Sequence, residues 1–317
     1  MDTLRGLAIL LVVFWHAPAV PALFGYQLPQ GLAALNDFFL PFRMPTLMFL
    51  SGMLLERSMR KDWRTYYLGK VQSLVWPYLL WAALHMVLYG GSLQLSNPRS
   101  WVATGYLWFL FYITCYYFIA PLLKRLPPWL TPLAMLLASI PQDDGMPKKF
   151  LYFGAFFFCG HLVMRYQGLL EHALKPSIAL AAGVVGVGLG VASMWFGDYL
   201  AYRGEFAPFS LLGILSMIYV SRLSAGYAWT RLIAFVGRNS LIYYASHFPL
   251  ILLVKHGAEF IGVHNIWAIA VPGFVLSMAV GTGLAYLRND PPVRWLFTAP
   301  LIHRLTPPRS KKAALVS

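Results

Sequence analysis

An arginine and a histidine, Arg5 and His16, lie within the apolar segment LRGLAILLVVFWHAPAV at residues 4–20. They are eleven residues apart, which in an α-helix is a rise of ~16 Å and close to three full turns, so both side chains share one face. Asp2 falls near the same stripe. Ionisable groups inside a membrane are costly and usually mark functional sites. We therefore interpret Asp2, Arg5 and His16 as a functional stripe, with a histidine hydrogen-bonded to a neighbouring helix as the alternative.

A basic segment, ERSMRKDWRTYYLGK, follows at residues 56–70. Arg57 and Arg60 are three residues apart, which predicts that they lie on one helical face, and Lys61 and Arg64 continue the patch. Arginines in this arrangement suit phosphate groups, although the ordinary excess of positive charge in cytoplasmic loops would also explain them. A phosphorylated ligand held at this loop could extend a tail toward His16.

Arg43 lies in the apolar segment NDFFLPFRMPTLMFLSGMLLER, between two prolines. We expect Pro41 and Pro45 to break this helix, because proline leaves backbone groups that the protein or a polar cavity must satisfy. Arg43 then either faces such a cavity or extends its side chain toward the membrane surface, and the sequence leaves both possibilities open.

A second histidine in an apolar segment, His247, lies in GRNSLIYYASHFPLILL. Asn239 or Ser240 is expected to cap this helix, which would place His247 near the middle of the membrane. His85 and His161 also have apolar neighbours, and we expect them to be packed and hydrogen-bonded. The sequence contains no spacing typical of a metal site.

These residues need helices that cross a membrane to position them. Of the 317 residues, 59% are hydrophobic and 11% are charged, whereas soluble domains have about 25% charged residues. The fold class is therefore an all-α integral membrane protein, a bundle of about ten transmembrane helices of roughly 20 residues each. Residues 1–287 form the transmembrane domain and residues 288–317 a basic, loosely ordered cytoplasmic tail. The expected spans are 5–24, 38–56, 71–89, 104–123, 129–142, 150–166, 176–196, 206–221, 238–254 and 266–287.

Charge predicts the orientation of these helices. With the N-terminus in the cytoplasm, 19 of the 25 lysine and arginine residues fall on the cytoplasmic side. This agrees with the positive-inside rule and places both termini in the cytoplasm. The same asymmetry explains the net charge of +14 without nucleic acid as a partner.

The N-terminus and the cysteines give simpler expectations. We interpret the first apolar segment as a retained helix rather than a cleaved signal peptide, because a histidine would be unusual in a signal peptide's hydrophobic core. Cys115 and Cys159 lie within apolar segments, which favours buried free thiols.

The chain resembles the acyltransferase-3 family of integral-membrane acyltransferases, which acylate sugars and other hydroxylated acceptors. MDTLRGLAILLVVFWH matches the family's opening pattern with its Arg-x10-His motif, and MPTLMFLSGMLLERSMR matches the second helix and an Arg-x-x-Arg motif. LWFLFYI (107–113), FFFCGHLVMR (156–165) and GRNSLIYYASHFP (237–249) resemble later landmarks.

The resemblance implies a cytoplasmic acyl-CoA donor, with His16 as the catalytic histidine and with Arg57 and Arg60 needed for donor use. Lys61 and Arg64 would support donor binding, and Asp2 or Arg5 would orient the site or the donor. Relatives that acetylate sugars often have a histidine where this chain has Arg43, so a basic residue there suits an anionic acceptor or acyl group. Arg43 and His247 are the candidates for the acceptor side.

The expected function is O-acylation, with acetyl-CoA or another acyl-CoA donating to a hydroxyl of a glycan, a lipid-linked sugar or a small molecule. We expect the protein to lie in the bacterial inner membrane, in contact with membrane lipid, and to transfer the acyl group across that membrane. We expect no metal cofactor. His16 acts either as a general base or as a covalent acyl carrier. Competing hypotheses are a transporter or flippase of an acylated or lipid-linked substrate, and a structural subunit that binds acyl-CoA. The acceptor, the choice between acetyl and succinyl, and the oligomeric state are left open.

Overall fold

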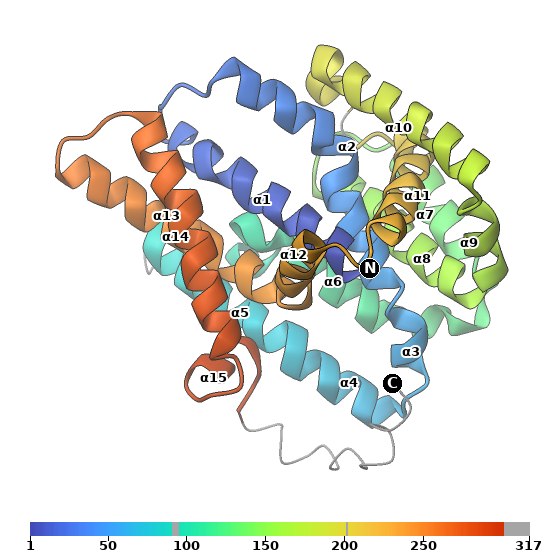
Figure 1. The fold of residues 1–317 in the computed structure, drawn as a ribbon. Helices are drawn as coiled ribbons and strands as arrows, with labels where there is room; N and C mark the ends of the chain where they lie inside the picture. Colours follow the sequence, from blue (N-terminus) through green and yellow to red (C-terminus); the bar gives the residue numbers. More distant parts are fainter. Residues whose placement is uncertain (91–94, 201, 301–317) are drawn as a thin grey trace. The chain divides into compact units, whose positions relative to one another are not determined.

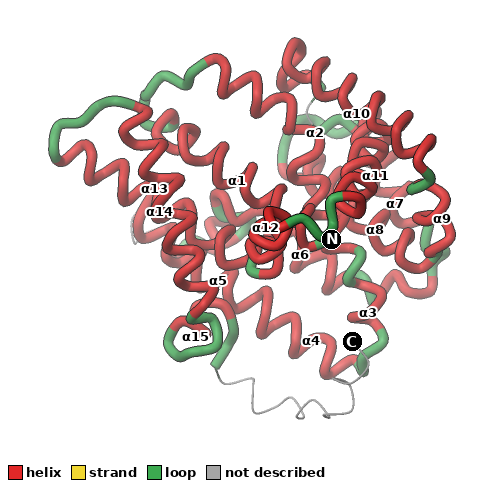
Figure 2. Tube along the Cα trace, in the orientation of Figure 1, coloured by secondary structure: helices red, strands yellow, loops and turns green. Residues whose placement is uncertain are grey.

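All the regular structure in the described part of the chain is helical. The computed structural model describes residues 1–90, 95–200 and 202–300, and in these ranges it contains helices joined by loops and no strand (Figures 1 and 2). This confirms the predicted all-α class.

Several of these helices have the length and apolar character needed to cross a membrane, as in a multi-pass membrane protein. Within the described ranges, six helical stretches meet both requirements: Asp2–Ala22, Gln30–Met59, Trp63–Tyr89, Pro176–Phe196, Gly204–Leu223 and Ile266–Tyr286. The other four expected spans also contain helices, α6 (Trp108–Ile119), α7 (Leu130–Ser139), α8 (Met146–Arg165) and α13 (Ser240–Phe260), which do not combine both properties. The total of ten spans and the cytoplasmic location of both termini therefore stay predictions.

The second helix is not broken, which corrects the expectation from its prolines. Helix α2 (Gln30–Gly52) runs for 23 residues with Pro41 and Pro45 inside it. At 1.5 Å per residue it is ~35 Å long, enough to cross a hydrocarbon core of ~30 Å. Prolines are tolerated in membrane helices where neighbouring protein satisfies the freed backbone groups, and α2 is packed between other helices over most of its second half.

The chain folds as two compact units. The first contains residues 1–56 and 115–286, and the second contains residues 57–114 and the chain after residue 286. In the first unit α1 and α2 are the central helices. Helix α1 (Asp2–Ala22) packs against α2, α12 (Ala228–Arg238), α13 and α14 (Ile266–Tyr286), whereas α2 packs against α8, α10 (Pro176–Phe196) and α11 (Ala207–Leu223).

Glycines allow backbone contact between helices in the first unit. A Cβ atom added to Gly52 of α2 would lie on the carbonyl of Phe157 in α8, and one added to Gly237 of α12 would lie on the carbonyl of Asp2 in α1. Gly6 and Gly160 make the reciprocal approaches. Small residues at such crossings bring helices into van der Waals contact, which drives helix association where lipid removes the hydrophobic force.

Helix α12 was not expected from the sequence, which placed residues 222–237 in a loop. It lies beside the beginning of α1 (Figure 1). Val236 and Gly237 are buried, while Leu232 is 74% exposed. With eleven residues it is too short to cross a membrane, so it has no apolar segment of spanning length by which the sequence would reveal it.

The second unit contains one long helical stretch with two irregularities. It runs from α4 (Trp63–Lys70) through α5 (Trp76–His85), with π-helical turns at Val71–Val75 and Met86–Gly90. Pro77 has no amide hydrogen to donate to the carbonyl of the residue four positions earlier. That residue, Ser73, lies within the first π-helical turn.

The beginning of the predicted tail is ordered, contrary to expectation. Helix α15 (Val293–Phe297) packs on α5, where the Phe297 ring stacks on Trp81 at 5.7 Å between centroids. Trp76 Nε1 donates a hydrogen bond to the Trp295 carbonyl at 2.7 Å. Residues 301–317, the rest of the predicted tail, lie outside the described residues.

We expect Gly52→Ala to destabilise the first unit by about 1–3 kcal/mol, because the added methyl group overpacks a backbone contact that cannot yield without moving α8. Thermal unfolding of the purified protein in detergent measures this as a lower melting temperature. Gly188→Ala in α10 is the matched control, because a Cβ there meets nothing within 4 Å. An equal melting temperature for Gly52→Ala and Gly188→Ala would contradict the proposed contact.

Candidate active site

Two histidines from different helices meet inside the first unit. His16 of α1 and His247 of α13 have ring centroids 4.9 Å apart, with their planes at 65°. The sequence identified each as a candidate but did not predict that they touch. Both lie in the interior of their helices, and this shared depth is the signal that could have paired them.

The hydrogen bonds of these rings determine which nitrogen carries the proton. His16 Nδ1 donates to the Val12 carbonyl at 2.8 Å, and His247 Nδ1 donates to the Tyr244 carbonyl at 2.7 Å. A carbonyl oxygen can only accept, so Nδ1 is the protonated nitrogen in each ring. The lone pair of the neutral imidazole is therefore on Nε2, the nitrogen available for base or nucleophile chemistry.

The two histidine residues differ in exposure. His247 has no exposed surface, whereas His16 is partly exposed. Helix α14 contacts the backbone of His247, because Ser277 Oγ lies 3.3 Å from the His247 carbonyl oxygen. The same hydroxyl lies 2.7 Å from the Gly273 carbonyl oxygen of its own helix. His247 therefore forms the buried side of the histidine pair and packs against the ring of His16.

Arg43 is buried within the protein rather than extended toward the membrane surface. Its side chain is 7% exposed, and Nη1 donates to Asn36 Oδ1 at 2.8 Å. Its guanidinium carbon lies 5.9 Å from the centre of the Trp15 ring. Because Trp15 precedes His16 in α1, Arg43 belongs to the same region of the first unit as the histidine pair.

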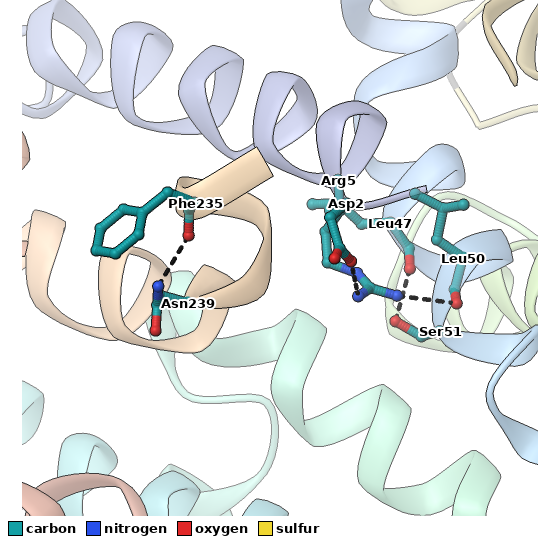
Figure 3. Close-up of polar contacts among 7 residues, drawn as sticks. All are labelled: Asp2, Arg5, Leu47, Leu50, Ser51, Phe235 and Asn239. Atoms are coloured by element: carbon teal, nitrogen blue, oxygen red, sulfur yellow. Dashed lines mark hydrogen bonds and ion pairs between the residues drawn. The ribbon is translucent and has the colours of Figure 1, made fainter. Parts of the chain in front are cut away.

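Asp2 and Arg5 lie in the first turn of α1, where Arg5 connects this helix to α2. Arg5 Nη1 lies 3.6 Å from Asp2 Oδ1, and Nη2 donates to the Leu50 carbonyl of α2 at 3.2 Å (Figure 3). The stripe predicted on α1 thus has two parts, an anchor in its first turn and an imidazole about three turns later.

Asn239 occupies the predicted position before α13 but does not cap that helix with its side chain. Its Nδ2 donates to the Phe235 carbonyl of α12 at 2.8 Å, at a distance from the Arg5 group (Figure 3). Asn239 therefore ties the end of one helix to the start of the next.

A cluster around Glu56 was missed in the sequence. His161 Nε2 lies 3.1 Å from Glu56 Oε2, and Arg165 Nη1 lies 3.7 Å from the same oxygen. This confirms that His161 is hydrogen-bonded. Glu56 lies in α3 (Leu55–Met59), directly after α2, and is more than 100 positions from His161 and Arg165 of α8, so the packing of α2 on α8 is what brings the three together.

The basic segment, from its second residue onward, belongs to the second unit. Its four candidate phosphate-binding side chains are exposed: Arg57, Arg60, Lys61 and Arg64. The prediction of one continuous helical face is wrong. Helix α3 (Leu55–Met59) ends before Arg60, and α4 begins at Trp63. Asp62 caps α4 by accepting from the Thr65 amide at 2.9 Å, and hydrogen bonds from Thr65 hold the pKa of the Asp62 carboxyl below its usual range. The cations therefore lie around the bend between α3 and α4 rather than on one helical face.

The thiols and possible metal ligands give simpler results. Cys115 and Cys159 are free. Among the residues that the structure describes, no group of three or more histidine, cysteine, aspartate or glutamate side chains is arranged to hold a metal ion.

Comparison with known proteins places this geometry in a family. A family model described as an acyltransferase domain, that of the acyltransferase-3 family, matches residues 1–286. No curated protein and no solved structure matches the chain. Because the match covers nearly all the membrane helices and includes both histidines of the candidate site, the chain belongs to the acyltransferase-3 family and is a multi-pass membrane acyltransferase.

Proposed function

We propose that this protein transfers an acyl group, acetyl in the simplest case, from acyl-CoA to a hydroxyl group of a glycan or another acceptor. The observation that carries the proposal is the state of His16. Its Nδ1 donates to the Val12 carbonyl, so Nε2 carries the lone pair of the ring. A histidine in this state is suited to acyl transfer.

Two routes fit such an imidazole. In the direct route Nε2 accepts the proton of the acceptor hydroxyl while its oxygen attacks the thioester carbonyl, and the proton then passes to the departing CoA thiolate. In the covalent route Nε2 attacks the thioester first and CoA leaves as the thiolate. The acceptor hydroxyl then takes the acyl group from the ring, and its proton passes to the thiolate. In both routes His247 acts as a positioning residue, because its ring packs against His16 and is itself fully buried.

The donor supplies phosphates that need cations. We assign these to the exposed basic segment of Arg57, Arg60, Lys61 and Arg64, since arginine pairs readily with phosphate oxygens. The positive-inside rule places this segment in the cytoplasm, where acyl-CoA is found. The corresponding location is a bacterial inner membrane, with O-acetylation of a polysaccharide or its precursor as the biological outcome.

Replacing the histidine tests the chemistry. We expect His16→Gln to lower turnover of acetyl-CoA by the purified protein by about 10²-fold or more, because the base or nucleophile is lost. Release of free CoA is the measurement. His172→Gln is the matched control, because His172 is exposed on α9 (Gln167–Ala173) outside the candidate site. Wild-type turnover in a folded His16→Gln variant would refute the catalytic role.

Replacing the arginines tests the donor site. We expect Arg57→Ala combined with Arg60→Ala to raise the KM for acetyl-CoA about tenfold with little change in kcat, because charge-assisted contacts to the phosphates are lost. Arg99→Ala removes an exposed positive charge elsewhere in the second unit and serves as the control. If the double variant and Arg99→Ala have the same KM, the arginines serve only to orient the helices in the membrane.

The same assays separate the enzyme from its competitors. A transporter, a flippase or a structural subunit that binds acyl-CoA would not release CoA from acetyl-CoA. Absence of any turnover by folded wild-type protein supplied with hydroxylated acceptors would favour those classes.

A further inference from the structure

A shallow pocket lies between α1 and α2 in the first unit. Its lining is almost wholly apolar and includes Phe14 and Trp15 of α1 and Leu35 of α2. Two polar side chains, Asn36 and Arg43, also contribute to the lining. The pocket therefore combines a hydrocarbon surface with one positive charge.

The charge of Arg43 is incompletely satisfied. Nη1 binds Asn36 Oδ1, but Nε is buried and has no hydrogen-bond partner. Asp37 acts electrostatically on this charge and is connected to it through Asn36, whose Nδ2 donates to Asp37 Oδ1 at 3.0 Å, so the hydrogen-bond partner of the guanidinium is a neutral amide. A buried cation of this kind is costly unless an anion pairs with it. An anionic group in the pocket would supply that pairing.

The rim of the pocket indicates the rest of the ligand. Phe14 and Leu35 are each 40% exposed, on helices that are long and apolar enough to cross a membrane. Their exposed surface therefore faces lipid. A ligand that enters the pocket past these two side chains comes from the hydrocarbon of the membrane. A molecule with a hydrocarbon chain and an acidic head matches both parts of the pocket.

The pocket is also close to the candidate catalytic histidine. Trp15, which lies beside the Arg43 guanidinium, precedes His16 in the chain. An acidic group held at Arg43 would thus bring the neighbouring, hydroxyl-bearing part of the same molecule toward His16.

We propose that this pocket binds the acyl acceptor, and that the acceptor is a lipid-linked phosphate whose hydrocarbon chain lies against Phe14 and Leu35 while its phosphate pairs with Arg43. The hydroxyl group to be acylated lies beyond the phosphate, on the polar part of the molecule. This inference rests on the proposed function and narrows its acceptor to a membrane-borne anion.

Photolabelling with dodecyl phosphate that carries a diazirine in its chain tests the proposal. The full-length protein is placed in phosphatidylcholine nanodiscs, and labelled peptides are mapped by mass spectrometry. We expect labelling within residues 11–18 and 32–39, at least about tenfold above that given by the matching diazirine dodecanol, because the phosphate adds a charge-assisted contact to Arg43. Equal labelling by the alcohol would overturn the role of the charge.

Charge variants sharpen the measurement. We expect Arg43→Gln to lower labelling about tenfold, whereas Arg99→Gln, which removes an exposed charge in the second unit, leaves it unchanged. Unchanged labelling in Arg43→Gln would contradict the proposal. Complete displacement by inorganic phosphate would show that the hydrocarbon chain contributes nothing, and equal competition by phosphatidylglycerol would show a general lipid site; either result overturns the assignment to an acceptor.

A second variant keeps the test sound if Arg43→Gln fails to fold. Leu35→Trp fills the rim of the pocket from a partly exposed position and should reduce labelling. Leu180→Trp, on α10 and 71% exposed, adds the same group outside the pocket and should not. Equal labelling in the two variants would contradict the position of the chain. Because no acyl donor is present, the result is independent of whether His16 catalyses transfer.

Discussion

Polar groups inside a membrane protein must find their partners within the protein, because the surrounding hydrocarbon offers none. In the first unit this constraint is met largely by backbone carbonyls. His16 uses the carbonyl of Val12, Arg5 that of Leu50, and Tyr117 Oη that of Ser51 at 2.8 Å. These bonds hold the side chains in single orientations. Chemistry is then possible because the site is ordered before a substrate arrives.

Close helix packing gives these bonds their geometry. Gly237 lets α12 contact the beginning of α1, and Gly52 lets α8 contact α2. Helices in such contact cannot slide past each other without steric clashes, so Arg5 stays opposite Leu50 and Trp15 stays opposite Arg43. The positions of the candidate catalytic residues thus depend on residues that have no side chain.

The two arginines of the central helices illustrate how burial changes the meaning of a charge. At the beginning of α1, Arg5 has a carboxylate partner, Asp2, and a carbonyl partner, Leu50 of α2. Arg43 has a neutral amide partner, an aromatic ring and a buried nitrogen without a hydrogen bond. The first is satisfied and joins helices, whereas the second is the one that we assign to a ligand. This difference motivates the separate roles assigned to them.

Much of the architecture could be read from the amino-acid sequence. Helical class, the approximate positions of the apolar segments and the candidate residues His16 and Arg43 follow from composition and local spacing, because a helix in lipid needs about 20 apolar residues and tolerates few charges. Tertiary structure alone decided that His247 meets His16, that Glu56 meets His161, that α2 continues through Pro41, and that Arg43 is buried. Each of these depends on contacts between helices distant in the sequence, and local spacing carries no information about which faces of two such helices meet.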